Sequence, residues 1–399
     1  MRILFLTPTF PYPLDNGNKI LIFNTIIRLA KQHQVFLLSF IQGNQSEYFP
    51  YLKDYCAGIE TVSTPGPGIW GKDMSYSKKG LIKNLFCPLP YTISRWYLPE
   101  MERKLKEMVS KNKCDLVQIE TLHLAQFAKF TGNVPVILRQ HNVESRVMER
   151  YYKYASDPLK RAYAYFQWRK LLRYERRLCL DSDLVVTLSL VDKDALRKIS
   201  PEINAEVVPV GVDLGYFGAF FSARNSDEIL YIGNLYFPPA MENILYFLKE
   251  TWPKIKRIRP RARLSILGNC PKKETKNIRN FPDVIFLGEV EDVRPFMAAS
   301  ALTIVPHRIA SGVRFKILEA MAMKLPVVST PLGCEGLEVE DGKHILIADT
   351  PDMFADKVIA ILENDQLRNN LTEKAHALVQ ERYTWENANR ELNRLYERF

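Results

Sequence analysis

The chain has 399 residues, of which 47% are hydrophobic and 25% charged, and its formal net charge is +10. This length exceeds one ordinary core and predicts two domains of roughly 150 to 200 residues, and no apolar run approaches the about 18 residues that span a bilayer. The charge favours anionic partners such as phosphates, acidic lipids or nucleic acid, while six scattered cysteines without C-x-x-C spacing predict reduced thiols in a cytoplasmic protein and no metal site.

Apolar runs alternate with helical patterns in the first half of the chain. The runs typical of strands are RILFLT (2–7), QVFLLSF (34–40), DLVQIE (115–120), PVILRQ (135–140), DLVVTLS (183–189) and AEVVPV (205–210). Such an alternation indicates a parallel sheet covered on both faces. Residues 66–80, GPGIWGKDMSYSKKG, and the run to Tyr97 predict a long loop or a few short helices. Pro67, and the lack of a helix after it, argue against GPGIWG as a dinucleotide site.

A second series of strands and helices follows GAFFSARNSDE (218–228), which is typical of a linker. Its predicted strands are EILYIGN (228–234), ARLSILG (262–268), DVIFLG (283–288), ALTIVP (301–306), PVVST (326–330) and HILIA (344–348), and helices are predicted at about 352–363, 366–380 and 385–398. We therefore expect two doubly wound α/β domains in tandem. Ligands of such sheets bind at the carboxyl ends of the strands, which for two facing domains means the cleft.

The stretch SGVRFKILE (311–319) places two cations and one carboxylate at the start of an apolar helix. Gly312 permits close approach of a ligand, and Arg314, Lys316 and the helix N-terminus together suit a phosphate. Glu319 can accept two hydrogen bonds from a sugar diol, and phosphate plus diol describes a nucleotide. The alternative is a solvated surface with Glu319 paired to Lys316 at i, i+3.

The segment SGVRFKILEAMAMKLPVVSTPLGCEGL (311–337) resembles the nucleotide-sugar segment of family 4 glycosyltransferases, which have the GT-B fold. The usual motif has two acids separated by seven residues, followed by A-M-A-x-G-x-P-V-V. Glu319 matches the second acid, which in the family holds the ribose hydroxyls. Ser311 stands in place of the first acid, which contacts the donor hexose, and Lys324 replaces a glycine.

Further segments agree with this family in order. PTFPYPLDNGNKI resembles its amino-terminal glycine loop, and VVPVGVDLGYF resembles V-P-N-G-V-D-x-x-x-F. ILYIGNLYFPPAMEN lacks the Arg and Lys that hold phosphate in many members, so the chain is similar to the subgroup with G-x-R-x-K, which includes exopolysaccharide-associated sugar transferases. The donor-binding residues that the resemblance and the local chemistry indicate are Gly17, Gly233, Asn234, Ser311, Gly312, Val313, Arg314, Lys316 and Glu319.

The resemblance also implies a domain arrangement. We expect a Rossmann-like acceptor domain over 1–217, a linker over 218–227, and a Rossmann-like nucleotide-sugar domain over 228–383. The terminal stretch 384–399 resembles the helix that returns to brace the first domain.

Catalytic residues are expected where two strands of the first domain end. DLVQIETLH lies where relatives carry a catalytic His or Asp, and it offers Glu120; the next strand ends at RQHNVES with His141. A carboxylate or imidazole there suits polar contact with a sugar or management of a hydroxyl proton. The alternatives are a helix N-terminal acid for Glu120 and a satisfied buried histidine for His141. We interpret His123 as structural and assign no chemical role to His307.

Residues 153–177 carry eight Lys and Arg against two acids, among several aromatic side chains. Such a stretch suits peripheral association with an anionic membrane at its inner face or stacking on single-stranded nucleic acid. The alternative is a long helix with a solvated face. Because the charge is not concentrated around a known nucleic-acid motif, we expect no nucleic-acid partner.

These patterns predict a glycosyltransferase, and the family resemblance implies a retaining reaction that needs no bound metal and no cofactor. It would move a hexose from a nucleoside diphosphate sugar to a saccharide or lipid-linked acceptor. A nucleotide-sugar epimerase of the same fold and a non-catalytic nucleotide-sugar-binding protein are the alternatives. The base, the sugar, the acceptor and the linkage do not follow from the sequence.

Overall fold

The computed structural model describes residues 1–399 except 44, 65–77, 156, 219–224 and 311. The chain forms two compact units. Unit 1 consists of Met1–Val210 and Trp385–Phe399, and unit 2 consists of Gly211–Thr384. The GPGIWG segment and Ser311 lie outside the described residues.

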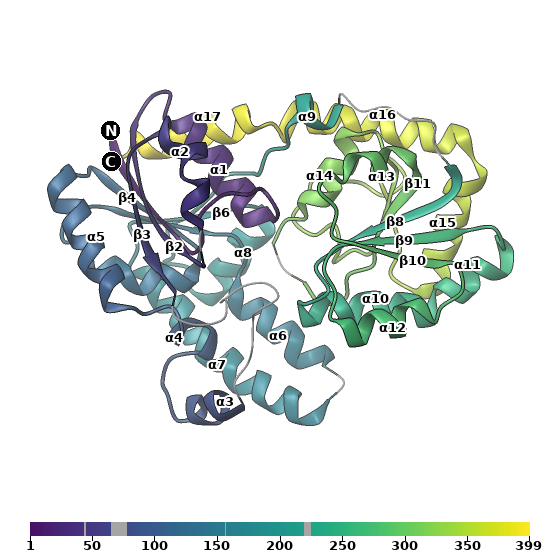
Figure 1. Ribbon diagram of the computed structural model, residues 1–399, viewed down its shortest axis with the longest axis horizontal. Coiled ribbons are helices and arrows are strands. Elements are labelled where there is room, and N and C mark those ends of the chain that lie inside the picture. Colours follow the sequence, from purple (N-terminus) through teal and green to yellow (C-terminus); the bar gives the residue numbers. More distant parts are fainter. Residues whose placement is uncertain (44, 65–77, 156, 219–224, 311) are drawn as a thin grey trace. The chain divides into compact units, whose positions relative to one another are not determined.

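Unit 1 is built on a seven-stranded parallel sheet in the order β3-β2-β1-β4-β5-β6-β7 (Figure 1). The strands are β1 Arg2–Thr7, β2 Gln34–Ile41, β3 Cys56–Ser63, β4 Leu116–Glu120, β5 Val136–Gln140, β6 Leu184–Thr187 and β7 Ala205–Val207. The six predicted strands are confirmed. The prediction missed β3, because this edge strand is half exposed and interrupts its apolar residues with glycine, glutamate and threonine.

Helices surround the sheet of unit 1. They are α1 Gly17–Leu29, α2 Pro50–Lys53, α3 Lys78–Leu85, α4 Tyr91–Ser94, α5 Pro99–Asn112, α6 Glu144–Tyr154, α7 Pro158–Leu180, α8 Leu190–Ile199 and α17 Trp385–Tyr396, with 3₁₀ helices η1 Gln45–Tyr48 and η3 Leu122–Phe130. The core includes Leu4, Leu38, Val117 and Leu138 of neighbouring strands, all fully buried. The short helices α3 and α4 lie in the described part of the run to Tyr97. Of the two predictions for this run, a long loop or a few short helices, the structure supports the second.

Unit 2 repeats this architecture with a six-stranded parallel sheet in the order β10-β9-β8-β11-β12-β13. The strands are β8 Asn225–Ile232, β9 Arg263–Leu267, β10 Val284–Gly288, β11 Ser300–Val305, β12 Val327–Ser329 and β13 Leu346–Ile347. Its helices are α9 Leu214–Gly218, α10 Pro238–Glu250, α11 Trp252–Ile258, α12 Lys272–Arg279, α13 Arg294–Ala299, α14 Phe315–Ala322, α15 Pro351–Glu363 and α16 Asp365–Arg382.

Each sheet reverses its strand order once, and this reversal locates a binding edge. The reversal falls between β1 and β4 in unit 1 and between β8 and β11 in unit 2. In open α/β sheets, ligands bind beyond the carboxyl ends of the strands at this point. Glu120 ends β4 at the first of these positions, and the 306–314 loop follows β11 at the second.

The units divide the chain at Val210 rather than at the expected residue 217. The segment after Val210 belongs to unit 2 because α9 packs against α14 and the Arg294 guanidinium lies 3.7 Å from the centroid of the Tyr216 ring. Strand β8 also begins at Asn225, inside the segment expected to be a linker. The terminal helix α17 packs against α1 and belongs to unit 1.

Among the described residues, no helix is both long and apolar enough to cross a bilayer. The described residues also contain no group of three or more His, Cys, Asp or Glu side chains placed to hold a metal ion.

Candidate functional site

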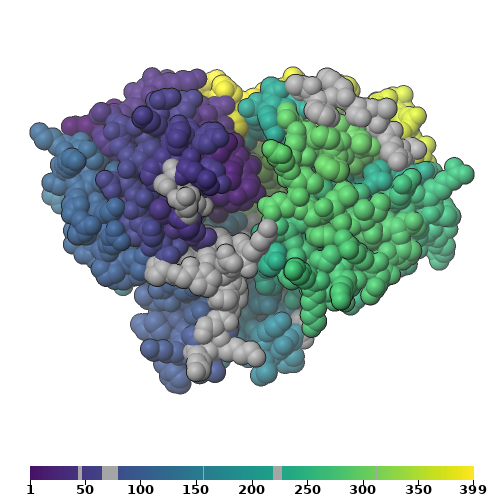
Figure 2. Space-filling model, in the orientation of Figure 1, coloured from purple at the N-terminus to yellow at the C-terminus, as the bar shows by residue number. Residues whose placement is uncertain are grey.

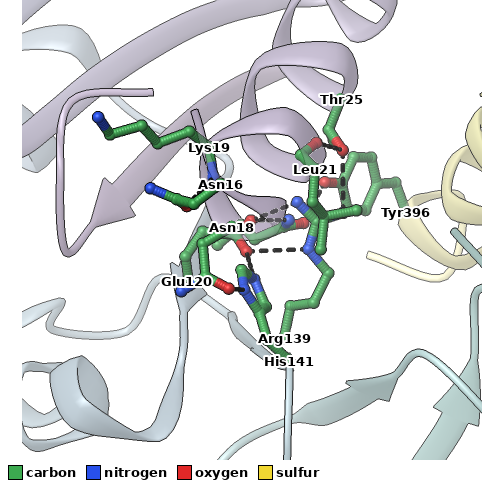
Figure 3. A network of polar contacts seen from close by, with 10 residues as sticks. Asn16, Asn18, Lys19, Leu21, Thr25, Glu120, Arg139, His141 and Tyr396 are labelled. Atoms are coloured by element: carbon green, nitrogen blue, oxygen red, sulfur yellow. Dashed lines mark hydrogen bonds and ion pairs between the residues drawn. The ribbon is translucent and has the colours of Figure 1, made fainter. Parts of the chain in front are cut away.

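The candidate site of unit 1 combines the start of α1 with the ends of β4 and β5. Asn16 caps α1, since its backbone is extended and its side-chain oxygen accepts a hydrogen bond from the Lys19 amide at 3.1 Å. This cap places Asn18 in the first turn of the helix. Glu120 ends β4 and His141 follows β5, so the fold brings both predicted catalytic residues together with Asn18 (Figure 3).

The Glu120 carboxylate is fully buried and saturated with hydrogen bonds. Arg139 donates to both of its oxygens, at 2.9 Å and 2.7 Å, and Gln118 donates at 2.7 Å. His141 Nε2 lies 2.6 Å from Oε2. Burial alone would raise the pKa of Glu120, but the Arg139 charge and the His141 contact lower it to about 2. Glu120 is therefore an ionised group that holds its neighbours in place.

The His141 ring is buried and contacts oxygen-bearing groups at both nitrogens. Burial lowers its pKa below the usual value, and the Glu120 carboxylate opposes that effect. The neutral ring carries one proton, which the carboxylate draws to Nε2. Nδ1 lies 2.9 Å from the side-chain oxygen Oδ1 of Asn18. An Nδ1 without a proton therefore needs the Asn18 amide to turn its NH₂ group towards the ring. Asn18 thus occupies the Nδ1 side of the ring, and a hydroxyl reaches Nδ1 only by displacing that side chain.

The network continues to parts of the chain that sequence reasoning missed. Arg139 donates to the Thr25 hydroxyl at 3.0 Å, and the Tyr396 hydroxyl of α17 donates to Gln118. Arg139 and Gln118 each interrupt an otherwise apolar strand, VILRQ and LVQIE, and that interruption was the available signal. Tyr396 gave none, because its partner lies 278 positions away in the sequence.

Replacement of Tyr396 by phenylalanine tests this brace. We expect Tyr396→Phe to lower the free energy of unfolding by about 1–3 kcal/mol, because the buried Gln118 oxygen loses its donor. The matched control is Tyr231→Phe, since the buried Tyr231 hydroxyl has no hydrogen-bond partner among the described residues. Thermal or denaturant unfolding compares the two variants. Equal stability of the two would contradict a bracing role for the Tyr396 hydroxyl.

The candidate site of unit 2 begins with the loop before α14. Gly312 has a φ of 77°, a conformation that favours glycine, and Val313 is half-buried. Arg314 occupies the N-cap position of α14 and is itself buried. Its guanidinium donates to the Gly312 carbonyl and, at 3.0 Å, to the Leu332 carbonyl. These bonds fix a cation at the amino end of the helix.

Lys316 and Glu319 lie on the first turns of α14 without forming a salt bridge. The Lys316 amine instead donates to the carbonyl of Ile232, the last residue of β8, so the expected alternative of a Lys316–Glu319 pair is wrong. Burial, aided by Arg314, lowers the pKa of Lys316 to about 8. Burial raises the pKa of Glu319 to about 7. No described residue donates a hydrogen bond to the Glu319 carboxylate.

The turns after β8 and β9 are packed tightly enough to require glycine. A Cβ at Gly233 would lie 2.8 Å from the Tyr231 hydroxyl oxygen, and a Cβ at Gly268 would lie 2.1 Å from the Gly233 carbonyl oxygen. Gly268 also has a φ of 122°. Asn234 is exposed, and its side chain accepts a hydrogen bond from the Tyr236 amide at 3.1 Å. Sequence reasoning found Gly233 but missed Gly268.

Most of the predicted donor residues thus share the carboxyl edge of the sheet in unit 2, whereas Gly17 begins α1 in unit 1. His307, which sequence reasoning left without a role, follows β11 and is buried. Burial and the charges of Lys316 and Arg314 lower its pKa well below the usual value. Two cations beside a neutral imidazole, near a helix N-terminus, form a site that suits a diphosphate.

Two sheets with this Rossmann-type strand order place the protein in the GT-B class of sugar-transferase folds. The family models for "Glycosyltransferase Family 4" and "Glycosyl transferases group 1" match residues 16–216 and 226–364 respectively. The chain therefore belongs to the family 4 glycosyltransferases.

Individual relatives agree with this assignment. An uncharacterized 44.6 kDa protein in the cps region of Klebsiella pneumoniae is 22% identical over 96% of each chain. A phosphatidyl-myo-inositol mannosyltransferase of Mycobacterium tuberculosis is 28% identical over 49% of this chain and 54% of its own length. A putative teichuronic acid biosynthesis glycosyltransferase of Bacillus subtilis is 21% identical over 59% and 57% of the two chains.

Solved structures with this fold include two that cover nearly the whole chain. HepE of Anabaena, in complex with UDP and glucose, has a TM-score of 0.71 at 14% identity and covers 100% of both chains. Sucrose-phosphate synthase of Thermosynechococcus elongatus has a TM-score of 0.75 at 16% identity and covers 100% of this chain and 99% of its own.

Proposed function

We propose that the protein is a retaining hexosyltransferase that uses a nucleoside diphosphate sugar. Its acceptor is a saccharide or lipid-linked hydroxyl, and its product belongs to a polysaccharide or glycoconjugate. The observation that carries the proposal is the cationic loop at the edge of unit 2, where Arg314, Lys316 and Glu319 offer two cations and a carboxylate with no hydrogen-bond donor among the described residues. HepE, which has the same fold, binds UDP and glucose. The relatives encoded in the cps region and in teichuronic acid biosynthesis support the product class.

In this proposal Arg314 and Lys316 hold the diphosphate, and Glu319 holds the ribose diol. Gly312 and Val313 let the backbone approach the phosphates, and Gly233 and Asn234 border the same edge. Ser311 contacts the hexose, and Gly17, the first residue of α1 in unit 1, remains a donor-binding prediction of the family resemblance. Two cations and a helix N-terminus stabilise the negative charge of the departing diphosphate. In other transferases a metal ion neutralises this charge. The reaction then needs no bound metal and no cofactor.

His141 is the group that touches the sugar or the acceptor, and Glu120 positions it. A substrate hydroxyl that displaces Asn18 from Nδ1 can hydrogen-bond to that nitrogen, while Nε2 stays fixed on the carboxylate. Positioned proton acceptors of this kind typically contribute 10²- to 10⁴-fold to rate, by order of magnitude. Glu120 is ionised, fully buried and bonded to Arg139, so it acts through His141 rather than on the substrate.

The donor site predicts a pH dependence that separates its two halves. Below about pH 7 Glu319 is protonated in the ligand-free protein, so nucleoside affinity rises as pH increases through 7. Above about pH 8 Lys316 loses its proton, so nucleoside diphosphate affinity falls again while nucleoside affinity does not. Calorimetric titrations at several pH values from below 7 to above 8 check this, with the nucleoside and the nucleoside diphosphate of the base that binds best, uridine and UDP being the first pair. Parallel pH curves for both ligands would contradict the division of labour.

Product analysis separates this function from its two rivals. The protein is incubated with nucleotide sugars, with and without saccharide or lipid-linked acceptors, and the released nucleotide and the sugar products are identified. The proposal expects nucleoside diphosphate release that needs an acceptor, and a product with the donor's anomeric configuration. A sugar isomer formed without an acceptor indicates an epimerase. Tight donor binding without turnover over the whole panel indicates a binding protein.

A further inference from the structure

The exposed face of α7 in unit 1 is both apolar and cationic. Leu159 is 82% exposed and Phe166 is 55% exposed, one two turns after the other along the helix. The exposed positions beyond them are the cations Arg169, Arg173, Arg176 and Arg177, and Leu180 at the helix end. The helix contains a single acid, Glu175, and that side chain is fully buried. No acid within α7 therefore neutralises the charge of this face.

The end of α3 extends this face. The Lys170 amine donates to the Asn84 carbonyl at 2.6 Å, and Gln167 of α7 donates to the Asn84 side chain at 2.9 Å. These bonds hold α3 against the middle of α7 (Figure 1). Ile82 of α3 is 63% exposed, and Phe86, which follows α3 directly, is 90% exposed. We name the exposed side chains of Ile82, Phe86, Leu159, Phe166, Arg169 and Arg173 the α3–α7 surface. Figure 2 shows the α3 and early α7 segments reaching the surface of unit 1.

The chemistry of this surface selects a lipid partner over a nucleic acid. Single exposed apolar residues are normal, but several beside each other mark an interaction site. Leu159 and Ile82 are aliphatic and among the most exposed side chains, and aliphatic groups do not stack on bases as nucleic-acid sites require. Apolar side chains that enter the acyl boundary, next to Arg and Lys at headgroup phosphates, are typical of interfacial helices.

The surface is tied to the His141 loop by α6. Helix α6 begins at Glu144, directly after that loop, and its first backbone amides donate to Glu175 of α7 at 2.9 Å and 3.2 Å. Tyr152 of α6 stacks on Trp168 of α7 with ring centroids 6.0 Å apart. The two helices therefore form one hairpin, and whatever α7 binds also orients the loop that carries His141.

We propose that the α3–α7 surface docks on an anionic membrane. Its cations bind lipid phosphates, and its apolar side chains enter the boundary of the acyl chains. The docked hairpin presents the His141 edge to acceptors at the membrane. Docking goes beyond sugar transfer and does not depend on the donor, so it is measured without any nucleotide sugar, and its failure leaves the donor assignment untouched.

Vesicle flotation of the full-length protein tests the proposal. The vesicles are phosphatidylcholine alone or phosphatidylcholine mixed with phosphatidylglycerol. We expect binding only to the mixed vesicles, weaker at high salt, because each cation near the surface contributes roughly fivefold in affinity at low salt. Arg169→Glu with Arg173→Glu should weaken binding by roughly 10- to 10²-fold. Leu159→Ser with Phe166→Ser should also weaken vesicle binding, and the loss should be similar at low and high salt because the apolar contribution is not screened.

A matched control is Lys273→Glu with Lys276→Glu on α12 of unit 2. It changes net charge by the same amount at two exposed positions, and it should leave vesicle binding unchanged. Unfolding temperatures establish that every variant is folded. Equal loss in both charge-reversal variants would mean that net charge alone drives binding and would overturn the proposal. Equal recovery of the wild-type protein with neutral and anionic vesicles, or no recovery with either, would overturn it as well.

Discussion

His141→Ala should lower the turnover of sugar transfer by roughly 10²- to 10⁴-fold, the range for a positioned proton-accepting group. The imidazole is held in a fixed orientation, because Nε2 lies 2.6 Å from Glu120 and Nδ1 lies 2.9 Å from Asn18. Alanine removes this oriented group, and no neighbouring side chain takes its place. Nucleoside diphosphate affinity should stay within a factor of two or so, because the diphosphate is assigned to unit 2. Steady-state kinetics and calorimetric titration measure the two quantities separately.

His123→Leu is the control for His141. His123 is also a buried histidine of unit 1, and its ring centroid lies 5.8 Å from that of Trp96. Replacing His123 should leave turnover near the wild-type value. Glu120→Gln should lower turnover as well, but it leaves the buried Arg139 charge without its carboxylate, which typically costs about 3–5 kcal/mol of stability. Its kinetics are therefore compared at a temperature where the variant is folded. If His141→Ala keeps full turnover, the catalytic edge lies elsewhere.

The donor loop should show a division of labour when its charges are removed one at a time. Arg314→Ala and Lys316→Ala should each weaken nucleoside diphosphate binding by roughly 10- to 10²-fold, since a charged hydrogen bond contributes about 1.5–3 kcal/mol. Neither should alter nucleoside binding much, because a nucleoside has no phosphate. Glu319→Gln should weaken nucleoside and nucleoside diphosphate alike. Ser311→Ala should affect only intact sugar donors.

Lys324→Ala is the matched control for these cations. Lys324 lies just beyond the other end of α14 and pairs with Glu373 at 2.8 Å, so its loss changes net charge without reaching the donor edge. Isothermal titration of each variant with nucleoside, nucleoside diphosphate and sugar donor gives the comparison. Should Arg314→Ala lose nucleoside and nucleoside diphosphate binding equally, its effect is a collapse of the Gly312 loop and the phosphate assignment fails.

Strand identity could be predicted because the parallel strands are buried on both faces. Runs such as RILFLT and ALTIVP are continuously apolar, and the structure places them at β1 and β11, next to the reversal of each sheet. The unit boundary could not be predicted, because it depends on how α9 packs against α14 and on the Arg294–Tyr216 stack, which are contacts between distant residues.

The candidate residues followed from strand ends, but their roles did not. Sequence position predicted that Glu120 and His141 would lie at one edge, and the structure brings them within 2.6 Å. The pairing of the ionised Glu120 with Arg139, and the contact of Tyr396 with Gln118, depend on residues that are far apart in the sequence. The same holds for Lys316. Its i, i+3 spacing favours an ion pair with Glu319, but its amine donates to the carbonyl of Ile232 instead.

Thermal unfolding of the wild-type protein with a panel of nucleosides, nucleoside diphosphates and nucleotide sugars tests the donor site most directly. One base should stand out. Its diphosphate at about 100 times its dissociation constant should stabilise the protein by roughly 2.7 kcal/mol, and its sugar form should do so at least as well. The nucleoside alone should give a smaller shift at equal concentration. If no nucleoside diphosphate raises the unfolding temperature at millimolar concentration, the cations before α14 do not form a nucleotide site.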